Sequence, residues 1–395
     1  MAIEVAKDLF WVGVVDWSLR HFHGHELSTH RGSTYNCFLI KDEKTALVDT
    51  VWAPFAGQYI QQLKAAVDLA RIDYIIVNHA EPDHSGALPE LVRLCPNAQL
   101  ICSTRGADSL AGLYHADWKL QTVKTGQRLP LGRRQLTFIE APMLHWPDSM
   151  FTHLSDGILL PNDAFGQHYA TAFRFNDQVD QEELHCEALK YYANILAPFS
   201  AQVLSKIDEL LKLNLPVSMI LPSHGVMWRQ DPLQIVRKYQ EWASQRPQKR
   251  ATILYDTMWE GTRRMADVIG EGLADEQLPY KAYHTAVTDR NDVIADLLLT
   301  GAVIVGSPTQ NRGLMPSVAS VLEDLLRLGF KNKQAAAFGT YGWSGECVKL
   351  IEERLAACKF PLAAPGVRAK WMPTDQDLVA CRELGRKLAL AVQAG

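Results

Sequence analysis

Four side chains that commonly bind metal ions fall within six positions of the sequence: His79, Glu81, Asp83 and His84. They follow the apolar run "YIIVN". His79, Glu81 and Asp83 are spaced by two, so in an extended segment their side chains point in one direction, and His84 points in a neighbouring one. A lone histidine beside a turn is usually structural, but four potential ligands together favour a metal site. We therefore predict metal binding directly after this strand.

The same arrangement recurs after three later apolar runs. His145 follows "LTFIEAPML", Asp163 follows "GILLPN", and His224 follows "VSMILPS". Ligand sites in open α/β sheets lie beyond the carboxyl ends of strands, so these residues are expected to converge. Seven donors exceed what one octahedral ion accepts, which predicts two ions bridged by Asp163. The three carboxylates favour iron, with zinc as the alternative.

Two regions with different patterns position these residues. The first alternates short apolar runs, typical of strands buried on both faces, with helical segments such as 56–70. After a polar, basic segment near residue 249 the pattern restarts with "ATILYDT" and continues in strict strand–helix alternation. That alternation is typical of one doubly wound parallel sheet. We predict an α/β protein with domains 1–248 and 249–395.

Three loops of the second region have the composition of a nucleotide-binding site. In "YDTMWEGTRRMA" a strand gives way to a helix, where backbone N–H groups and hydroxyls form an anion cradle. The loops "GSPTQNRG" and "GTYGWSG" add polar and aromatic side chains, as flavin mononucleotide (FMN) requires. A plain helix cap and solvent-facing aromatics are the alternative interpretation. The predicted FMN-binding residues are Thr257, Met258, Trp259, Gly261, Thr262, Ser307, Pro308, Thr309, Asn311, Thr340, Tyr341, Gly342, Trp343 and Gly345.

Composition excludes several other classes of protein. The net charge of −4 gives no basic field for nucleic acid, and no apolar run approaches the roughly 18 residues that span a membrane. The seven cysteines are odd in number and scattered, with no C-x-x-C, which predicts free thiols in the cytoplasm. The missing C-x-x-C also excludes a rubredoxin-type metal module on this sequence.

The motifs "HAEPDH", "MLHWPDSM", "NDAFGQH", "PSHG", "YDTMW", "GSPT" and "GTYGWSG" together resemble those of the flavodiiron proteins, or A-type flavoproteins. The resemblance covers essentially the whole chain and is close to the flavodiiron core of flavorubredoxins. It implies a metallo-β-lactamase-like αβ/βα domain followed by a flavodoxin-like domain. Glu81 stands where hydrolytic relatives carry a second histidine. By this resemblance one iron takes His79, Glu81 and His145, the other takes Asp83, His84 and His224, and Asp163 bridges them; the position of His84 is a ligand in only some members.

The resemblance also implies an activity. Two ferrous ions and a fully reduced flavin hold the four electrons that reduce dioxygen to two waters, and joining two nitric oxide molecules into nitrous oxide needs two. We expect reduction of NO, O2 or both, with electrons from a rubredoxin-type donor and its reductase, in a head-to-tail homodimer or homotetramer. Flavorubredoxins carry a rubredoxin domain after the flavodoxin-like one, so the donor here is expected to be a separate protein or a part outside this sequence. Tyr192, His23 and Trp146 are expected to line the substrate pocket, and Asp49 and His168 to support the ligands.

Two other functions are consistent with parts of the pattern. A dinuclear zinc metallohydrolase with a flavodoxin-like appendage would use a zinc-bound hydroxide, but Glu81 argues against it. An electron-carrying flavodoxin with a degenerate first domain would have lost ligands, and every ligand position is filled. The flavodiiron interpretation is therefore preferred.

Overall fold

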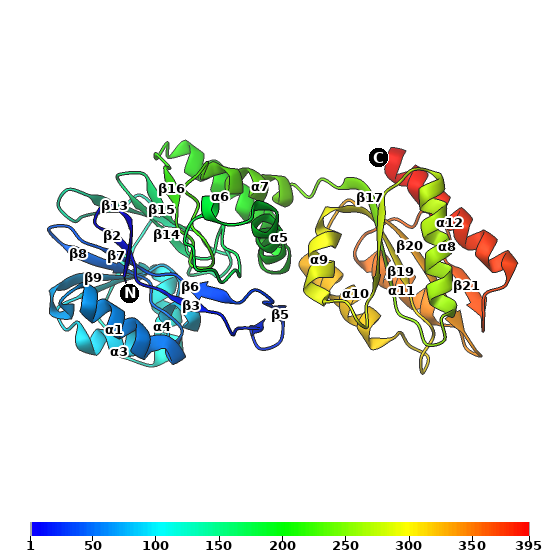
Figure 1. Ribbon diagram of the computed structural model, residues 1–395, viewed down its shortest axis with the longest axis horizontal. Coiled ribbons are helices and arrows are strands. Elements are labelled where there is room, and N and C mark those ends of the chain that lie inside the picture. Colours follow the sequence, from blue (N-terminus) through cyan, green and yellow to red (C-terminus); the bar gives the residue numbers. More distant parts are fainter. Residues whose placement is uncertain (1, 395) are drawn as a thin grey trace. The chain divides into compact units, whose positions relative to one another are not determined.

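The computed structural model describes residues 2–394 and divides the chain into two compact units (Figure 1). The first contains the chain up to Tyr191 together with residues 199–240, and the second contains residues 192–198 and the chain from Glu241 onward. The domains 1–248 and 249–395 remain our proposal for the functional modules.

The first unit is built on two β-sheets. The seven-stranded sheet has the order β1 (Ile3–Ala6), β2 (Leu9–Trp11), β7 (Phe38–Ile40), β8 (Thr45–Val48), β9 (Ile72–Val77), β10 (Gln99–Ser103) and β11 (Leu120–Val123). The five-stranded sheet has the order β12 (Arg128–Pro130), β13 (Gln135–Glu140), β14 (Met150–Leu154), β15 (Ile158–Leu160) and β16 (Met219–Ile220). Two small two-stranded sheets pair β3 (Val14–Asp16) with β6 (Ser33–Tyr35), and β4 (His21–Phe22) with β5 (Leu27–Ser28).

Strand β9 shows how the apolar runs are used. Ile76 joins a core that also contains Phe138 and Leu160 from the five-stranded sheet, so that core lies between the two sheets. Ile75 and Val77 point the other way, into a core shared with helices. The strand is therefore buried on both faces, as its unbroken apolar sequence predicts.

Helices cover the outer faces of both sheets. The seven-stranded sheet is covered by α1 (Ala56–Ala66), α3 (Leu88–Leu94) and α4 (Thr104–Tyr114). On the five-stranded sheet, α6 (Ser200–Lys212) and α7 (Leu233–Ala243) lie beside Leu159 and Ile220. Figure 1 shows these two groups of helices on opposite sides of the paired sheets. The layers run helix, sheet, sheet, helix, which confirms the predicted αβ/βα sandwich.

The second unit contains a single parallel sheet with the order β18 (Tyr280–His284), β17 (Gln248–Tyr255), β19 (Thr300–Gly306), β20 (Gln334–Tyr341) and β21 (Val367–Lys370). Numbered along the unit this order is 2-1-3-4-5, that of flavodoxin-like folds, with a switch point between β17 and β19. The doubly wound sheet is therefore confirmed.

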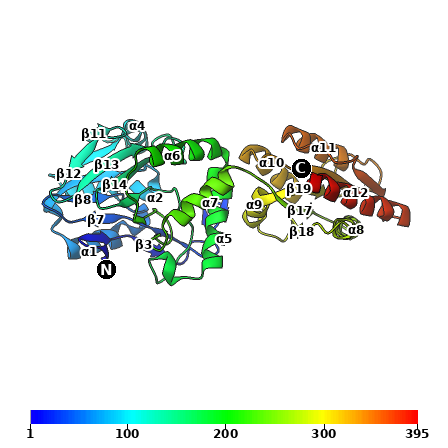
Figure 2. The same ribbon diagram turned by 90° about the horizontal axis from the view of Figure 1, so that it is seen from above.

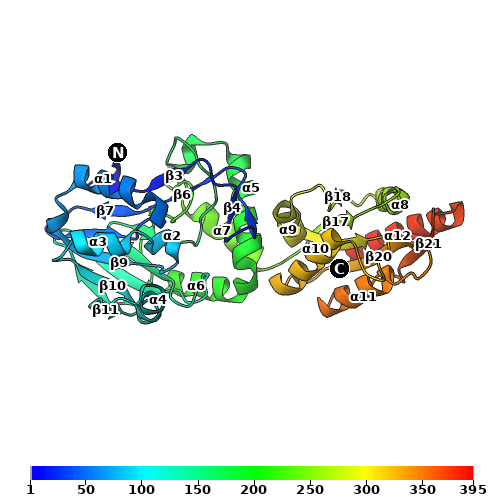
Figure 3. The same ribbon diagram turned by 90° about the horizontal axis from the view of Figure 1, so that it is seen from below.

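Five helices flank this sheet: α8 (Gly261–Asp275), α9 (Arg290–Leu299), α10 (Pro316–Leu328), α11 (Cys347–Ala357) and α12 (Asp375–Ala394). Met265 of α8 and Leu388 of α12 share one core with Ile253 and Ile304 of the sheet. Figures 2 and 3 show α8 on one side of strand β17, with α10 and α11 on the other.

Strand β21 of the second unit escaped the sequence analysis. The segment "VRAK" forms β21 at the edge of the sheet and is short, with charged residues between its apolar ones. It lacks the long apolar run of β19, which is buried at every position. An edge strand pairs on one side only and so carries the weakest sequence signal.

Two further observations concern the described residues as a whole. No helix within residues 2–394 combines the length and the apolar character needed to cross a membrane. The seven cysteines are all free thiols, and Cys186 alone among them is exposed.

Candidate metal centre and cofactor pocket

The segment after β9 divides its ligands between two directions. His79 and Glu81 continue the extended chain, and Pro82 then starts the short helix α2 (Pro82–Ser85). Proline is favoured at the first helical position because its φ angle already suits a helix. The N–H that proline lacks would have no partner within the helix at that position. Asp83 and His84 therefore lie on a helical turn, and the expectation that Asp83 points with His79 and Glu81 along an extended segment was wrong. The turn is what separates the four side chains into two pairs.

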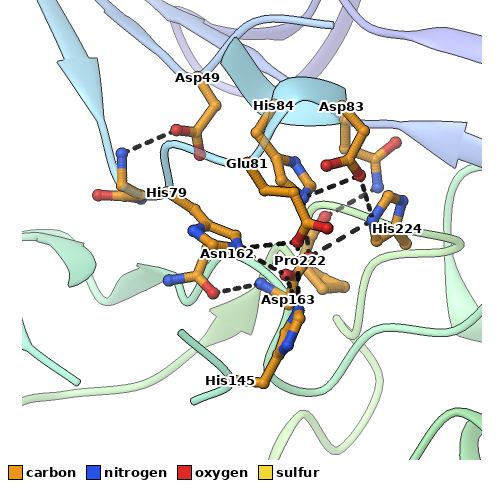
Figure 4. Close-up of polar contacts among 12 residues, drawn as sticks. Asp49, His79, Glu81, Asp83, His84, His145, Asn162, Asp163, Pro222 and His224 are labelled. Atoms are coloured by element: carbon orange, nitrogen blue, oxygen red, sulfur yellow. Dashed lines mark hydrogen bonds and ion pairs between the residues drawn. The ribbon is translucent and has the colours of Figure 1, made fainter. Parts of the chain in front are cut away.

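The other three predicted ligands come from loops of the five-stranded sheet. His145 lies between β13 and β14, Asp163 follows β15, and His224 follows β16. Figure 4 shows these residues grouped with the segment after β9. The structure thus brings together all seven residues that the sequence analysis selected as ligands.

The first group of donor atoms consists of His79, Glu81, His145 and Asp163. Glu81 Oε2 lies 3.1 Å from His79 Nε2 and 3.3 Å from His145 Nε2. Asp163 Oδ2 lies 3.4 Å and 3.2 Å from the same two nitrogens. Two imidazole nitrogens and two carboxylate oxygens therefore surround one point.

The second group consists of Asp83, His84 and His224. Asp83 Oδ2 lies 3.1 Å from the Nε2 atom of each histidine. Asp163 again takes part, because its Oδ1 atom lies 3.0 Å from His84 Nε2 and 3.4 Å from His224 Nε2 (Figure 4). One oxygen of Asp163 thus faces each group, which is the geometry of a bridging carboxylate.

Several polar atoms of this site are buried without a hydrogen bond. Among the described residues, these are both carboxylate oxygens of Asp83 and Asp163 and both ring nitrogens of His84, whose contacts with one another are ion pairs only. Buried polar groups are normally hydrogen-bonded, because an unpaired one costs free energy. Divalent cations bound between these oxygens and nitrogens would remove that cost. The residues present therefore fit two metal ions, one on each side of Asp163.

The electrostatic field of the group points to the same conclusion. Burial opposes the charged form of His79, but contacts with Asp148, Glu81 and Asp163 outweigh it and raise its pKa to about 10. Burial also opposes ionisation of Asp163, yet His84 and His145 hold its pKa well below the usual range. Carboxylates that hold protons on neighbouring imidazoles attract cations to the same place.

Two of the histidines are anchored through their outer nitrogen. His79 Nδ1 lies 3.0 Å from Asp148 Oδ2, and His224 Nδ1 lies 2.6 Å from the carbonyl oxygen of Thr34. A proton on Nδ1 leaves the Nε2 lone pair free for a metal. The sequence analysis missed Asp148, although it lies in the motif "MLHWPDSM" with His145.

The other residues expected near the ligands are placed as follows. His23 Nε2 lies 2.7 Å from Glu81 Oε1, and the Trp146 ring packs edge-on against His79 with centroids 5.2 Å apart. Asp49 accepts a hydrogen bond from the backbone N–H of Asn78 at 2.8 Å, and burial raises its pKa to about 7. His168 Nδ1 lies 2.8 Å from Ser33 Oγ.

The prediction for Tyr192 needs correction. Tyr192 belongs to the second unit, where its ring packs 5.5 Å from Trp242. Tyr191, the last residue of α5 (Gln181–Tyr191), instead lies beside His168 and His224, with ring centroids 5.1 Å and 6.2 Å apart. Consecutive helical residues point in different directions, so one of two adjacent tyrosines faces the site and sequence alone did not identify which.

The predicted FMN loops enclose a cavity of about 370 Å³ at the carboxyl ends of β17, β19 and β20. The predicted residues that line it are Met258, Trp259, Gly261, Pro308, Thr309, Asn311, Thr340, Tyr341, Gly342 and Trp343. The predicted residues outside the lining are Thr257, Thr262, Ser307 and Gly345, and the lining residues that the sequence analysis missed are Arg312, Ser344, Trp371 and Met372. Trp371 and Met372 follow β21, the strand that was not predicted.

The loop after β17 has features that suit an anion. Thr257 Oγ1, outside the cavity lining, is buried without a hydrogen-bonding partner among the described residues. Gly261 begins α8, and a Cβ atom there would lie 3.2 Å from Thr340 Cγ2, so a larger residue would narrow the approach to the backbone N–H groups. The first N–H groups of α8, which begins at the lining residue Gly261, match the needs of a phosphate anion.

Comparisons with known proteins agree with this geometry. Residues 33–225 match the family described as ODP family beta lactamase, and residues 253–385 match the flavodoxin family. The nitric oxide reductase of Moorella thermoacetica is 50% identical over 393 residues, which cover 99% of this chain and 98% of that protein.

Two solved structures superpose over the whole chain. The rubredoxin oxygen:oxidoreductase of Desulfovibrio gigas has a TM-score of 0.97 and 38% identity and covers 100% of this chain and 99% of its own. The flavodiiron protein of Giardia intestinalis has a TM-score of 0.95 and 34% identity and covers 100% of this chain and 97% of its own. The chain belongs to the flavodiiron protein family.

Proposed function

We propose that this protein is a flavodiiron oxidoreductase that reduces nitric oxide to nitrous oxide, with two irons held by the seven donor residues. The proposal depends above all on Asp163, because its two oxygens face separate groups of ligands. A relative that is 50% identical over nearly its full length is named a nitric oxide reductase.

Two bound irons would supply two electrons to the substrate. A bound FMN would supply the electrons that reduce the irons again. The residues of the chain position and polarise the substrate. Glu81, Asp83 and Asp163 set the negative charge around the ions, and His23 holds Glu81 Oε1. Burial, together with Asp163 and Asp83, raises the pKa of Tyr191, so its hydroxyl stays protonated and can donate a hydrogen bond to a substrate oxygen.

Dioxygen is the second candidate substrate. A structural neighbour with 38% identity and a TM-score of 0.97 is named a rubredoxin oxygen:oxidoreductase. The same site is proposed to reduce dioxygen to water, with nitric oxide as the preferred substrate.

An anaerobic assay tests this function. Protein loaded with iron and FMN and reduced beforehand should consume nitric oxide and release one nitrous oxide for every two molecules consumed, measured with an NO electrode and gas chromatography. A parallel assay with dioxygen gives the preference between the two gases. The proposal fails if the fully loaded protein turns over neither gas.

The zinc hydrolase alternative is separated by metal analysis. Protein purified without added metal should contain iron, approaching two ions per chain, and zinc-substituted protein should lack reductase activity. Two zincs per chain in native protein, with hydrolysis of a β-lactam or thioester substrate, would favour the hydrolase. Glu81 replaces a histidine that such hydrolases use, which disfavours this outcome.

The proposed partners are a rubredoxin-type electron donor with its reductase and a second copy of this chain. Trp259, Trp343 and Trp371 are 85%, 84% and 63% exposed at the rim of the flavin cavity. Exposed aromatic groups of this size often mark interaction surfaces, and we propose that they are covered in a head-to-tail homodimer or a homotetramer of such dimers. Light scattering after size exclusion should give the mass of a dimer or a tetramer, and a monomer with full turnover would contradict this.

The proposed location is the cytoplasm. The seven free thiols, six of them at least partly buried, suit a reducing compartment.

A further inference from the structure

Arg312 is the only charged residue in the lining of the flavin cavity among the described residues. The rest of the lining is apolar, aromatic or neutral, and no carboxylate takes part. A guanidinium at the exposed edge of this cavity is the one charged group of the lining that a bound ligand would meet.

The backbone holds Arg312 in a conformation that other residues adopt more easily. Gln310 and Gly313 exchange two backbone hydrogen bonds, of 3.0 Å and 2.7 Å, around Asn311 and Arg312. The φ angles of Asn311 and Arg312 are 48° and 64°, so both central residues of this tight turn are left-handed. Such a turn favours asparagine at its first central position and glycine at its second. Asn311 follows that preference and Arg312 does not.

No contact of the guanidinium within the described residues explains why this strained backbone conformation carries an arginine. Arg312 is exposed, and within residues 2–394 its side chain forms neither a hydrogen bond nor an ion pair. Residues kept in strained conformations without a structural partner are found most often at functional sites. The observation therefore points to a ligand in the adjoining cavity.

The location of the turn indicates which part of a flavin it meets. The predicted phosphate cradle lies on the loop after β17, where the first N–H groups of α8 begin at the lining residue Gly261. Arg312 lies on the loop after β19, and Tyr341 and Trp343, the aromatic side of the cavity, lie on the loop after β20. The helix start thus offers donors to a phosphate, whereas the ring gains negative charge when it is reduced.

We propose that Arg312 is a positioning residue that stabilises the anionic reduced flavin ring and thereby raises its reduction potential; this rests on the proposed binding of FMN. Two electrons from the rubredoxin-type donor and one proton from solvent convert oxidised FMN into the hydroquinone anion. The added negative charge resides on the N1 and C2-carbonyl edge of the ring. The guanidinium attracts that charge and has no comparable attraction for the neutral oxidised ring, so it favours the reduced state.

The test uses the full chain reconstituted with FMN and measures the two-electron midpoint potential by spectroelectrochemistry. Arg312→Gln should weaken binding of reduced FMN about tenfold relative to oxidised FMN, which lowers the midpoint potential by about 30 mV. Arg312→Lys keeps the charge and should recover most of the shift. Arg354→Gln, which removes an exposed arginine on α11 that pairs with Glu323 at 3.8 Å, should leave the potential unchanged.

The variant Arg312→Gly distinguishes an effect of the arginine's charge from a purely structural effect on the turn. Glycine suits the left-handed turn, so this variant should unfold at the same temperature as the unmodified protein or a higher one, while its potential falls as in Arg312→Gln. The shift should also shrink as salt is raised from low to high concentration, because the guanidinium is exposed.

Three outcomes would overturn the proposal. Equal potentials for the unmodified protein and Arg312→Gln would show that the charge does not reach the ring. A loss of FMN affinity without a loss of riboflavin affinity would assign Arg312 to the phosphate instead. If Arg312→Gln lowers the midpoint potential but Arg312→Gly keeps the potential of the unmodified protein, the effect belongs to the turn geometry and not to the charge. Failure of the unmodified protein to bind FMN would contradict the proposed function itself, which is a separate result.

Discussion

Asp148 Oδ2 lies 3.0 Å from His79 Nδ1, and both side chains are completely buried. The same oxygen accepts a hydrogen bond of 2.7 Å from the backbone N–H of Ala80. Asp148 thus fixes both the ring of one ligand and the chain segment that carries it. His84, in contrast, has a buried Nδ1 without a partner among the described residues. His79 and His84 therefore differ in how firmly their rings are held, and each group of candidate ligands contains one histidine anchored through Nδ1, His79 in the first and His224 in the second.

Asp148→Ala should weaken metal binding at the His79 position by about 10-fold to 100-fold, because the ring loses the contact that orients Nε2. Asp148→Asn should have a smaller effect, since an amide oxygen can still accept from Nδ1–H. Iron content after dialysis against graded chelator measures the change. Asp156→Ala, which removes an exposed carboxylate paired with Arg134, is the matched control and should retain its iron. Equal retention by Asp148→Ala would show that His79 needs no anchor.

Asp163→Asn should reduce the iron content below two ions per chain and lower turnover of nitric oxide by roughly 100-fold or more. The amide keeps the shape of the side chain but removes the negative charge that both groups of ligands share. His145→Ala removes a donor from one group only, so it should lose one ion more readily than the other. Metal analysis and Mössbauer spectroscopy separate these cases. Two fully occupied sites in Asp163→Asn would contradict a bridging role.

The sequence predicted much of the site because its information is local. His145, Asp163 and His224 each follow a recognisable strand, and the carboxyl ends of strands meet at one edge of a layered fold. The candidate ligands could therefore be selected without coordinates. The division into two groups could not, because it depends on the helical turn at Pro82, which an apolar-run analysis does not register.

The parts that were missed depend on orientation and on weak elements. Tyr191 and Tyr192 are adjacent residues of the same type. Only the orientation of the helix shows that Tyr191 is the one beside His224. Trp371 follows an edge strand in which charged residues alternate with apolar ones, so the strand was not recognised from its sequence. Arg312 looks like an ordinary loop residue until the backbone shows a tight turn that glycine would suit better.

Tyr191→Phe should lower turnover of nitric oxide on the order of 100-fold if its hydroxyl donates to the substrate in the transition state, since loss of one such donor has effects of that size. Tyr192→Phe is the matched control, because it removes the same atom from the neighbouring residue. It should leave turnover within about twofold and keep the contact with Trp242. Steady-state rates with an NO electrode, together with iron and FMN content, test both. The assignment fails if Tyr192→Phe is the more impaired variant.

Lys333 gives the stability of the second unit a defined dependence on pH. Its Nζ atom is buried and donates hydrogen bonds to the carbonyl oxygens of Leu298 and Thr300 at 3.1 Å and 2.8 Å. Burial, aided by the nearby charge of Arg250, lowers its pKa from 10.5 to about 7. Between these two values the unfolded chain binds a proton that the folded chain does not, so the free energy of unfolding rises with pH across this window and is level below it. The slope is at most about 1.4 kcal/mol per pH unit.

Lys333→Met should remove this slope, whereas Lys331→Met, at an exposed lysine two positions away, should keep it. Urea unfolding followed by flavin fluorescence at several pH values between 7 and 10 measures the difference. Parallel curves for the unmodified protein and Lys333→Met would mean that the buried amine stays charged in the folded state.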